Sequence, residues 1–230
     1  MRDDICTIPI SEIFEENDGC PICRMRNMLE NRMVDYILGA AMMEPDVRQE
    51  SNRLGFCATH LKQMMRFGKR LPLALVLETH LDTVQNEVFK EGLFATPKKS
   101  AYNAARIEET CFVCDKVQWG MERLLVTLLK TYAENYDFRE TFRGQEYICL
   151  PHYRLLLQQA PKTLIKKQLS DFTGDCKKLA GDWAKQLRAD VHDFTKMFDY
   201  RSGQDEDADF SRCKDAIERT YLWMTTRNDD

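Results

Sequence analysis

Cysteine and histidine residues with the spacing of metal ligands occur in two sets of four along the sequence. In the first set, the pair Cys20 and Cys23 is followed, after 33 intervening residues, by the pair Cys57 and His60. Thiolate and imidazole groups are ligands that zinc prefers, and a spacing of three residues lets two side chains reach one ion from a single tight turn. The sequence therefore predicts a Cys3His metal site.

The second set repeats the first at a nearly constant offset. Cys111 and Cys114 lie 91 residues after the first CxxC pair. Cys149 and His152 lie 92 residues after the first CxxH pair, and 34 residues separate the two pairs of this set. Two CxxC…CxxH patterns with matched spacing indicate a tandem duplication in which each copy carries its own ligands.

The matched gaps favour closure of each metal site within its own copy. An exchange of pairs between the copies, which would give two mixed sites, is the alternative. The expected ligands are Cys20, Cys23, Cys57 and His60 for one ion, and Cys111, Cys114, Cys149 and His152 for the other.

We expect zinc in both sites. Three thiolates and one imidazole complete the tetrahedron of a structural zinc site, whereas a catalytic site keeps one position for water. The alternative cofactor is an iron–sulfur cluster, because cysteine ligands are typical of clusters and histidine replaces cysteine in some of them. A metal-free dithiol protein is a third interpretation, but it leaves the two CxxH pairs without a role.

Apolar residues recur at spacings of three and four along most of the chain, which predicts helices. The longest such run extends from Ile165 to Phe198, and a helix of that length would be on the order of 50 Å long. No run of alternating apolar and polar residues predicts a sheet. We therefore expect an all-α fold with tandem duplicated helical arms, each with a Cys3His site, and a long C-terminal helix.

The duplication divides the sequence near residue 100. Residues 1–100 would form the first CxxC…CxxH helical repeat, and residues 101–230 would form the second repeat with a C-terminal helical extension. Glycine, proline and polar residues indicate a linker over residues 92–104 and a loop over residues 201–208.

The bulk composition, with 43% hydrophobic and 30% charged residues, is that of an ordinary globular protein. A net charge of −4 and short basic clusters mixed with acids argue against a nucleic-acid partner. No stretch approaches the ~20 apolar residues of a membrane span, and the acidic N-terminus does not match a signal peptide. Nine cysteines then favour metal ligation in a reducing compartment. We expect a cytoplasmic protein without a membrane partner, while a protein partner and a homo-oligomer stay open.

Residues outside the two sets give no catalytic site. His80 is expected to be a hydrogen-bonded, partly buried histidine, with an outer partner of the metal and a catalytic base as the alternatives. Cys176 and Cys213 lie on apolar helical seams and are predicted as small core residues, whereas the role of Cys6 cannot be deduced. No phosphate-binding loop, dinucleotide glycine motif, nucleophile elbow or HExxH motif occurs. An enzyme stays open, but no catalytic residue is predicted.

Seven stretches spread over most of the chain carry a family resemblance: Thr7–Ile10, Cys20–Cys23, Pro45–Arg48, Gly55–His60, Leu73–Leu81, Cys149–His152 and Phe198–Arg201. In these stretches the sequence resembles an uncharacterised bacterial domain of unknown function with duplicated CxxC…CxxH motifs, frequent in anaerobic Gram-positive bacteria. The resemblance implies no activity and no catalytic residue. The anaerobic setting that it implies favours the iron–sulfur alternative.

Two functional hypotheses follow from these observations. The first is a metal-binding helical protein, with zinc as the metal, that acts as an interaction or regulatory module. The second is an iron–sulfur or thiol-based protein that responds to redox conditions or to metal. Both use the same cysteines, so the metal in the two sites decides between them.

Overall fold

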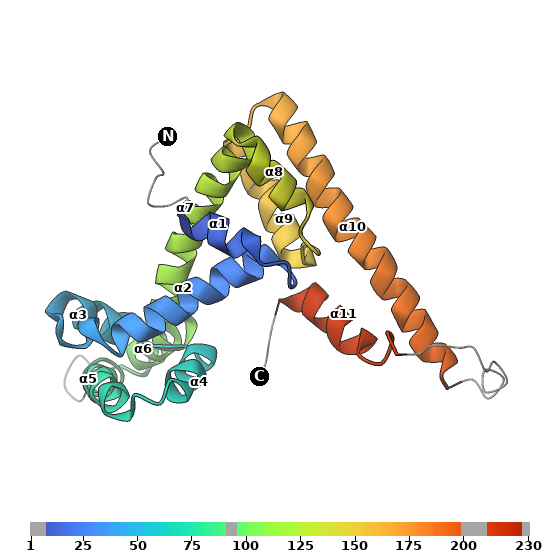
Figure 1. The fold of residues 1–230 in the computed structure, drawn as a ribbon. Helices are drawn as coiled ribbons and strands as arrows, with labels where there is room; N and C mark the ends of the chain where they lie inside the picture. The colour runs from blue at the N-terminus through green and yellow to red at the C-terminus, as the bar shows by residue number, and fades with distance from the viewer. Residues whose placement is uncertain (1–7, 91–95, 199–210, 227–230) are drawn as a thin grey trace. The chain divides into compact units, whose positions relative to one another are not determined.

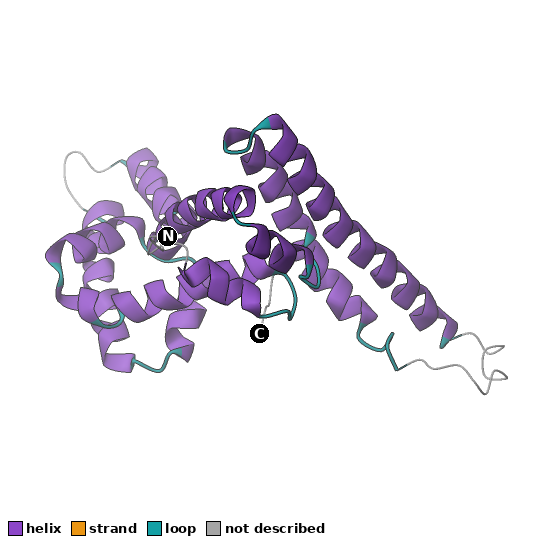
Figure 2. Cartoon of the chain, turned by 45° about the horizontal axis from the view of Figure 1, so that its top comes forward, coloured by secondary structure: helices purple, strands orange, loops and turns teal. Residues whose placement is uncertain are grey.

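The computed structural model describes residues 8–90, 96–198 and 211–226, and within these ranges it contains helices and connecting segments without any strand (Figures 1 and 2). The expected all-α fold is thereby confirmed. The elements before residue 90 are α1 (Ile8–Glu15), α2 (Pro21–Ile37), the 3-10 helix η1 (Ala40–Met43), α3 (Pro45–Leu54), α4 (Ala58–Arg66) and α5 (Arg70–Val88).

The elements of the second half repeat the order of the first. In each half, a long helix follows the CxxC pair, a short helix carries the CxxH pair, and another long helix comes next. The segments between the two ligand pairs differ, because η1 and α3 lie there in the first half and α8 in the second. The elements are α6 (Pro97–Glu109), α7 (Phe112–Glu134), α8 (Tyr136–Arg143), α9 (Leu150–Gln159), the 3-10 helix η2 (Ala160–Lys162), α10 (Lys166–Lys196) and α11 (Ala216–Thr225).

The chain forms two compact units that do not coincide with the two sequence repeats. Unit 1 consists of residues 1–25 and 123–230, and unit 2 consists of residues 26–122. The boundaries fall inside α2 and α7, so each of these helices begins in one unit and continues in the other. The division of the sequence near residue 100 concerns the duplication and stays a prediction.

The expected linker over residues 92–104 is wrong for most of its length. Residues from Pro97 onward belong to α6, and only the part before Thr96 lies outside the described residues. The Thr96 side chain accepts a hydrogen bond from the backbone N–H of Lys99 (3.3 Å), and Pro97 occupies the first position of the helix. Thr followed by Pro is a favourable helix start, because the hydroxyl satisfies a free N–H and proline needs none there.

The longest helix, α10, spans 31 residues, which corresponds to about 46 Å and agrees with the expectation from sequence. The two glycines inside it do not interrupt it. Its first half packs against α9 and its second half against α11, where Arg219 forms an ion pair with the buried Asp190 (2.9 Å). In the described part of the chain, no helix is both long and apolar enough to cross a membrane.

Two of the three cysteines outside the ligand sets lie in the core. Cys176 is fully buried on α10, and burial raises the pKa of its thiol. Cys213 is buried as well, with its Sγ 3.5 Å from the Sδ of Met197. The prediction of small core residues is confirmed for both. Cys6 and the expected loop over residues 201–208 lie outside the described residues.

Aromatic side chains form the centre of unit 1. Their ring centroids lie 4.9 to 5.9 Å apart, with tilted, stacked and edge-on contacts. Such pairs add about 0.5–1.5 kcal/mol each to the free energy gained from burial. These ring contacts therefore pack the helices α1, α7, α8 and α10 against one another. The residues are Phe14, Tyr132, Phe138, Phe142 and Phe172.

In unit 2, α2 crosses α7 at Gly120. A Cβ atom at this position would lie 3.1 and 3.3 Å from the two methyl carbons of Leu29, so any side chain here would require Leu29 to move. Leu29 and Gly120 are 91 residues apart, which is the offset between the CxxC pairs. The duplicated helices α2 and α7 thus contact each other at equivalent positions. In the same way, an isologous interface joins identical surface patches of two subunits.

We predict that Gly120→Leu destabilises the protein by about 1–3 kcal/mol, because the new side chain occupies the space of Leu29 and overpacks the crossing. The matched control is Gly181→Leu on α10, where a Cβ meets no atom within 4 Å. The control should gain roughly 0.5–1 kcal/mol, because leucine favours a helix more than glycine does. Urea unfolding followed by circular dichroism measures both. Equal stability of the two variants would show that the crossing has room for a side chain.

Candidate metal centres

The eight predicted ligands assemble into two groups, but the ligand pairs are exchanged between the copies. In each group, the ligand atoms all lie within 4.8 Å of one another. The expected closure within each copy is therefore wrong, and the alternative of mixed sites holds. The first centre, in unit 1, consists of Cys20, Cys23, Cys149 and His152, and the second centre, in unit 2, consists of Cys57, His60, Cys111 and Cys114.

A long helix separates the two ligand pairs of each copy. In the first copy, α2 has 17 residues, about 26 Å, and α3 has 10, about 15 Å. In the second copy, α7 spans about 35 Å and α8 about 12 Å. Each CxxH pair meets the CxxC pair of the other copy.

Every ligand pair lies at the start of a helix. Cys57 and Cys149 are the N-caps of α4 and α9, and Cys20 and Cys111 directly precede α2 and α7. The second ligand of each pair follows three residues later, on the first turn. Free backbone N–H groups and the positive end of the helix dipole favour a thiolate at this place. A metal ion in either centre would join two helix N-termini.

The first centre is almost closed to solvent. The Nδ1 atom of His152 lies 3.1 Å from the Sγ atom of Cys149, 3.3 Å from that of Cys23 and 3.7 Å from that of Cys20. The Sγ atoms of Cys23 and Cys149 are 3.7 Å apart. Cys20, Cys149 and His152 are exposed by 3%, 1% and 5%, so an ion held here would exchange ligands with water slowly.

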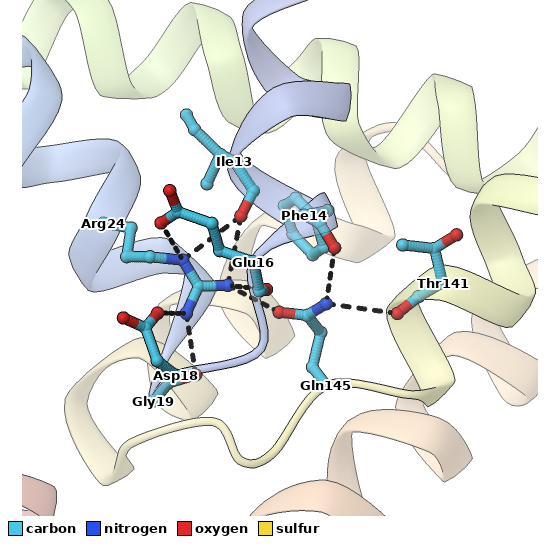
Figure 3. A network of polar contacts seen from close by, with 8 residues as sticks. All are labelled: Ile13, Phe14, Glu16, Asp18, Gly19, Arg24, Thr141 and Gln145. Carbon is cyan, nitrogen blue, oxygen red and sulfur yellow. Dashed lines mark hydrogen bonds and ion pairs between the residues drawn. The ribbon is translucent and has the colours of Figure 1, made fainter.

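Arg24 and Gln145 hold the two ligand pairs of the first centre together (Figure 3). Arg24, directly after the CxxC pair, donates to the carbonyl oxygen of Ile13 (3.1 Å), to Asp18 (3.0 Å) and to Oε1 of Gln145 (2.7 Å). Gln145, four residues before the CxxH pair, donates in turn to the carbonyl oxygen of Phe14 (2.8 Å). This network was not predicted from the sequence, which has Asp115 instead of an arginine directly after the second CxxC pair.

The C-terminal helices hold the segment that leads to Cys149. The ring of Tyr147 stacks on Trp183 of α10, with centroids 4.5 Å apart, and burial raises the pKa of its hydroxyl. Trp223 of α11 donates its indole N–H to the carbonyl oxygen of Ile148 (3.1 Å). The extension of the second repeat thus contributes to the first centre by fixing the approach of one ligand pair.

The second centre has the same ligands and greater exposure. The Nδ1 atom of His60 lies 3.2 Å from the Sγ atom of Cys57 and 3.4 Å from those of Cys111 and Cys114. The Sγ atoms of Cys57 and Cys114 are 3.9 Å apart. His60 and Cys111 are buried, but Cys114 is exposed and Cys57 is half-buried. Solvent and small reagents can therefore reach two of the four ligands.

Backbone contacts join the two ligand pairs of the second centre. The backbone N–H of Phe112 donates to the carbonyl oxygen of Gly55 (2.9 Å), and the Thr110 hydroxyl donates to the carbonyl oxygen of Leu54 (2.6 Å). Gly55 ends α3 with a φ angle of 64°, a backbone conformation that residues with a side chain rarely adopt. This turn brings the chain from α3 to the CxxH pair.

His80 supports the same segment. Its Nδ1–H donates to the carbonyl oxygen of Asn52 (2.9 Å), and its ring meets Phe56 edge-on at 6.1 Å between centroids. His80 is half-buried. The prediction of a hydrogen-bonded, partly buried histidine is confirmed, and the contact with Asn52 places it behind the second centre rather than among the ligands.

Glu30 faces the second centre from α2. Its Oε1 atom lies 3.7 Å from the buried Nε2 atom of His60, which has no hydrogen-bond partner. Arg26 donates to the same carboxylate oxygen (2.9 Å). Burial acts to raise the pKa of Glu30, but the interactions with His60 and Arg26 lower it overall. A carboxylate behind a ligating histidine is a common arrangement in zinc sites. The duplicated position carries Met121, so the repeat gave no signal for Glu30.

Charge at the second centre favours a cation. A hydrogen bond from Cys114 lowers the pKa of Cys111 to about 3 although burial opposes this, and the same contact raises the pKa of Cys114. Burial acts to lower the pKa of His60, but Cys111 and Glu30 raise it to about 10. The thiolate that this arrangement favours at Cys111 is the charge that a cation would compensate.

In the first centre too, the ionisation of one thiol is favoured at the cost of the others, because the three sulfurs lie close together. Burial acts to raise the pKa of Cys20, but hydrogen bonds from Cys149 and Cys23 lower it well below its usual value. The contact with Cys149 is the main cause of the raised pKa of Cys23, and Cys20 raises the pKa of Cys149 to about 12. Three thiolates so close together require a compensating positive charge, which a divalent ion provides.

Comparison of the sequence with protein families gives a match over the whole chain. Residues 1–230 match a family that is described as a family of unknown function (DUF6062). The chain belongs to the DUF6062 family. The expected resemblance to an uncharacterised family is thus confirmed. No curated protein and no solved structure matches this DUF6062 chain. The two Cys3His groups could each hold a metal ion, and they are the chemical feature on which a function can be argued.

We predict that Cys57→Ser in the DUF6062 protein exposes Cys111 and Cys114, because the loss of one ligand weakens the metal site that protects them. Alkylation of the native variant with iodoacetamide, mapped by mass spectrometry, should label these two thiols at least about tenfold faster than in the wild type. Cys20 and Cys149 should stay as protected as in the wild type.

The control for this experiment is Cys149→Ser, which should expose Cys20 and Cys23 and leave the second centre protected. If Cys57→Ser exposed Cys20 and Cys23 instead, the ligands would pair within each copy and the exchanged pairing would be refuted.

We predict that Glu30→Gln lowers the metal affinity of the second centre about 10- to 100-fold, because the neutral amide no longer supports His60 as a ligand. Competition with a chelator, followed by thiol labelling, measures each centre separately. Asp35→Asn is the matched control on the same helix, since Asp35 pairs with Lys69 at an exposed site. An affinity loss shared by both centres or by the control would contradict the role of Glu30.

Proposed function

We propose that each Cys3His group holds one zinc ion and that the protein is a zinc-binding helical module with an interaction or regulatory role. The observation that carries the proposal is the spacing of the ligand atoms. Eight residues from four separate helix starts converge on two points, and each point receives three sulfur atoms and one imidazole nitrogen. No other described group of three or more Cys, His, Asp or Glu side chains has this geometry.

The distances support a single ion in each centre. With zinc bonds of about 2.3 Å to sulfur and about 2.0 Å to nitrogen, a tetrahedron has edges of about 3.8 Å between sulfurs and about 3.5 Å between sulfur and nitrogen. Of the six sulfur–sulfur distances in the two centres, one in each measures 3.7 or 3.9 Å, and the others lie within 4.8 Å. The sulfur–nitrogen contacts measure 3.1 to 3.7 Å. The side chains therefore stand at the corners that one tetrahedral ion needs.

An iron–sulfur cluster fits this spacing less well. Each ligand of a cubane cluster binds a different iron atom, and iron and sulfide atoms separate the ligands from one another. The ligand atoms of such a cluster lie further apart than the 4.8 Å within which all four atoms of each centre lie here. Zinc is also favoured by the mixture of thiolates and imidazole in a tetrahedral arrangement.

The closed ligand sets support a structural role for the metal. Four protein ligands leave no position for a water or substrate molecule, and a catalytic zinc needs such a position. Each ion would clamp two helix N-termini that belong to different sequence copies. We therefore assign the protein to the cytoplasm, where thiolate ligands stay reduced, and to interaction with another protein rather than to catalysis.

The second centre favours one alternative function, a thiol-based response to oxidants. Cys57 and Cys114 are the two ligands that solvent reaches, and their sulfurs are 3.9 Å apart. Oxidation of two thiolates to a disulfide would remove two of four ligands and release the ion. The first centre, in which Cys20 and Cys149 are buried and only Cys23 is half-buried, would keep its metal under the same conditions.

We predict that the protein purified without added metal contains two zinc ions per chain and is colourless, because both centres are closed tetrahedral sites. Elemental analysis of a sample prepared under anaerobic conditions measures the metals, and an absorption spectrum of the same sample detects clusters. Iron with sulfide and broad absorbance in the visible range would refute the zinc assignment and support the iron–sulfur alternative. The control is a variant with Cys57→Ser and Cys149→Ser, which should contain less than one ion per chain.

A further inference from the structure

A groove in unit 1 lies between α9 and α10, away from the ligands of the first centre. Its volume is about 610 Å³, which is within the range of pockets for small molecules. Tyr153 and Leu157 line it from α9, and Leu169 lines it from α10. These side chains are half-buried, so the apolar floor is open to solvent along its length.

A lysine stands at each end of the groove. Lys166 and Lys177 both line it and are 11 residues apart on α10, which corresponds to about 16 Å along the helix. Neither lysine has an ion-pair partner among the described residues. The acidic residues of this half of α10 lie on its other side, and one of them, Asp175, pairs with Arg143 (2.8 Å).

The stretch of sequence that contains the groove is basic in a chain that is acidic overall, although only Lys166 and Lys177 of its basic residues line the groove. Residues 150–178 carry six basic and two acidic side chains, so the net charge of this stretch is +4, against −4 for the whole chain. The helix α9 contains no acidic residue at all. The basic residues are Arg154, Lys162, Lys166, Lys167, Lys177 and Lys178, and the acidic ones are Asp171 and Asp175.

We propose that this groove binds a small amphiphilic anion, with a carboxylate or sulfonate head and an aliphatic body. The aliphatic body lies on Leu157 and Leu169, and the head pairs with the ammonium group of Lys166 or Lys177. Lysine side chains suit this task, because their methylene groups cover apolar surface while the charge stays at the rim. The hydroxyl of Ser170 lies between the two lysines on the same face and offers a hydrogen bond to the head group.

The size of the groove favours a small molecule over a helix of another protein. A docked helix is about 10 Å wide and needs a continuous apolar stripe of three or more turns. Here the apolar floor is interrupted by Ser170 and Thr173, and lysines close both ends. A ligand with one narrow aliphatic chain fits between these polar side chains.

Gly174 gives a sharp test of the site. It lines the groove in the middle of α10, and a Cβ atom there would meet no other atom within 4 Å. A side chain at this position therefore projects into open space within the groove without a clash in the folded protein. Gly181 on the same helix is equally open but does not line the groove. Leucine at either position favours the helix, so both variants should fold.

The experiment measures binding of the fluorescent anion 8-anilinonaphthalene-1-sulfonate to the full chain and its displacement by dodecanoate. Gly174→Leu should weaken dodecanoate binding at least about tenfold because it fills the groove, whereas Gly181→Leu should bind as the wild type does. Circular dichroism confirms that both variants are folded. Equal binding by the two variants would overturn the proposal.

A charge-matched pair of double variants tests the lysines. Lys166→Glu with Lys177→Glu should weaken dodecanoate binding at least about tenfold, and it should leave the binding of uncharged dodecanol within about twofold. Lys167→Glu with Lys178→Glu makes the same change in net charge outside the groove and should have little effect. An equal loss of dodecanoate affinity in both double variants would mean that the anion binds a diffuse basic surface. That result would refute the proposed site.

A peptide provides the competing outcome. If a synthetic amphipathic helix with acidic residues displaced the fluorescent anion in the wild type but not in Gly174→Leu, and dodecanoate did not displace it, the groove would be a peptide-docking site. That result would overturn the proposal of a small-molecule ligand.

Discussion

Each metal centre requires residues that are more than 50 positions apart in the chain, and this constraint organises the rest of the structure. In the first centre, Cys20 and His152 are separated by 132 residues. In the second, His60 and Cys111 are separated by 51. Neither centre can form until both sequence copies are in place. The α2 and α7 helices each run from one compact unit into the other, and they contact each other through Leu29 and Gly120.

The two centres have the same types of ligand, three cysteines and one histidine, but differ in the residues that surround them. The first is buried and is fixed by Arg24, Gln145 and the C-terminal helices. The second leaves Cys114 in contact with solvent and has a carboxylate, Glu30, behind its histidine. Duplication supplied the same ligands twice, and the residues around them then diverged. Two ions of one kind can thus differ in the rate at which they exchange or oxidise, because access to the thiolates controls both processes.

The groove between α9 and α10 is connected to the first centre through α9. His152, a ligand, and Tyr153, a groove residue, are neighbours on this helix and point to different sides. An ion in the first centre would fix the start of α9 and would thereby help to determine where its other face lies against α10. A ligand in the groove and an ion in the first centre would share one rigid element, which gives a physical route for each to affect the other.

The sequence by itself determined the helical fold of this protein and the eight Cys and His residues that form two groups able to hold a metal ion. It did so because a three-residue spacing of Cys and His is a local feature, and a helical period depends on near neighbours. It also predicted the long α10 helix and a hydrogen bond of His80. The helix α6 was not predicted, because its polar residues are typical of a loop.

Only the tertiary structure decided how the ligands pair. The gaps of 33 and 34 residues favoured closure within each copy, but the direction in which a helix carries the chain is not visible in a gap length. Glu30 and Gln145 escaped prediction for the same reason, since their partners, His60 and Arg24, are distant from them in sequence. Pairing depends on which helix starts meet in space, and only the folded chain shows that each CxxH pair meets the CxxC pair of the other copy.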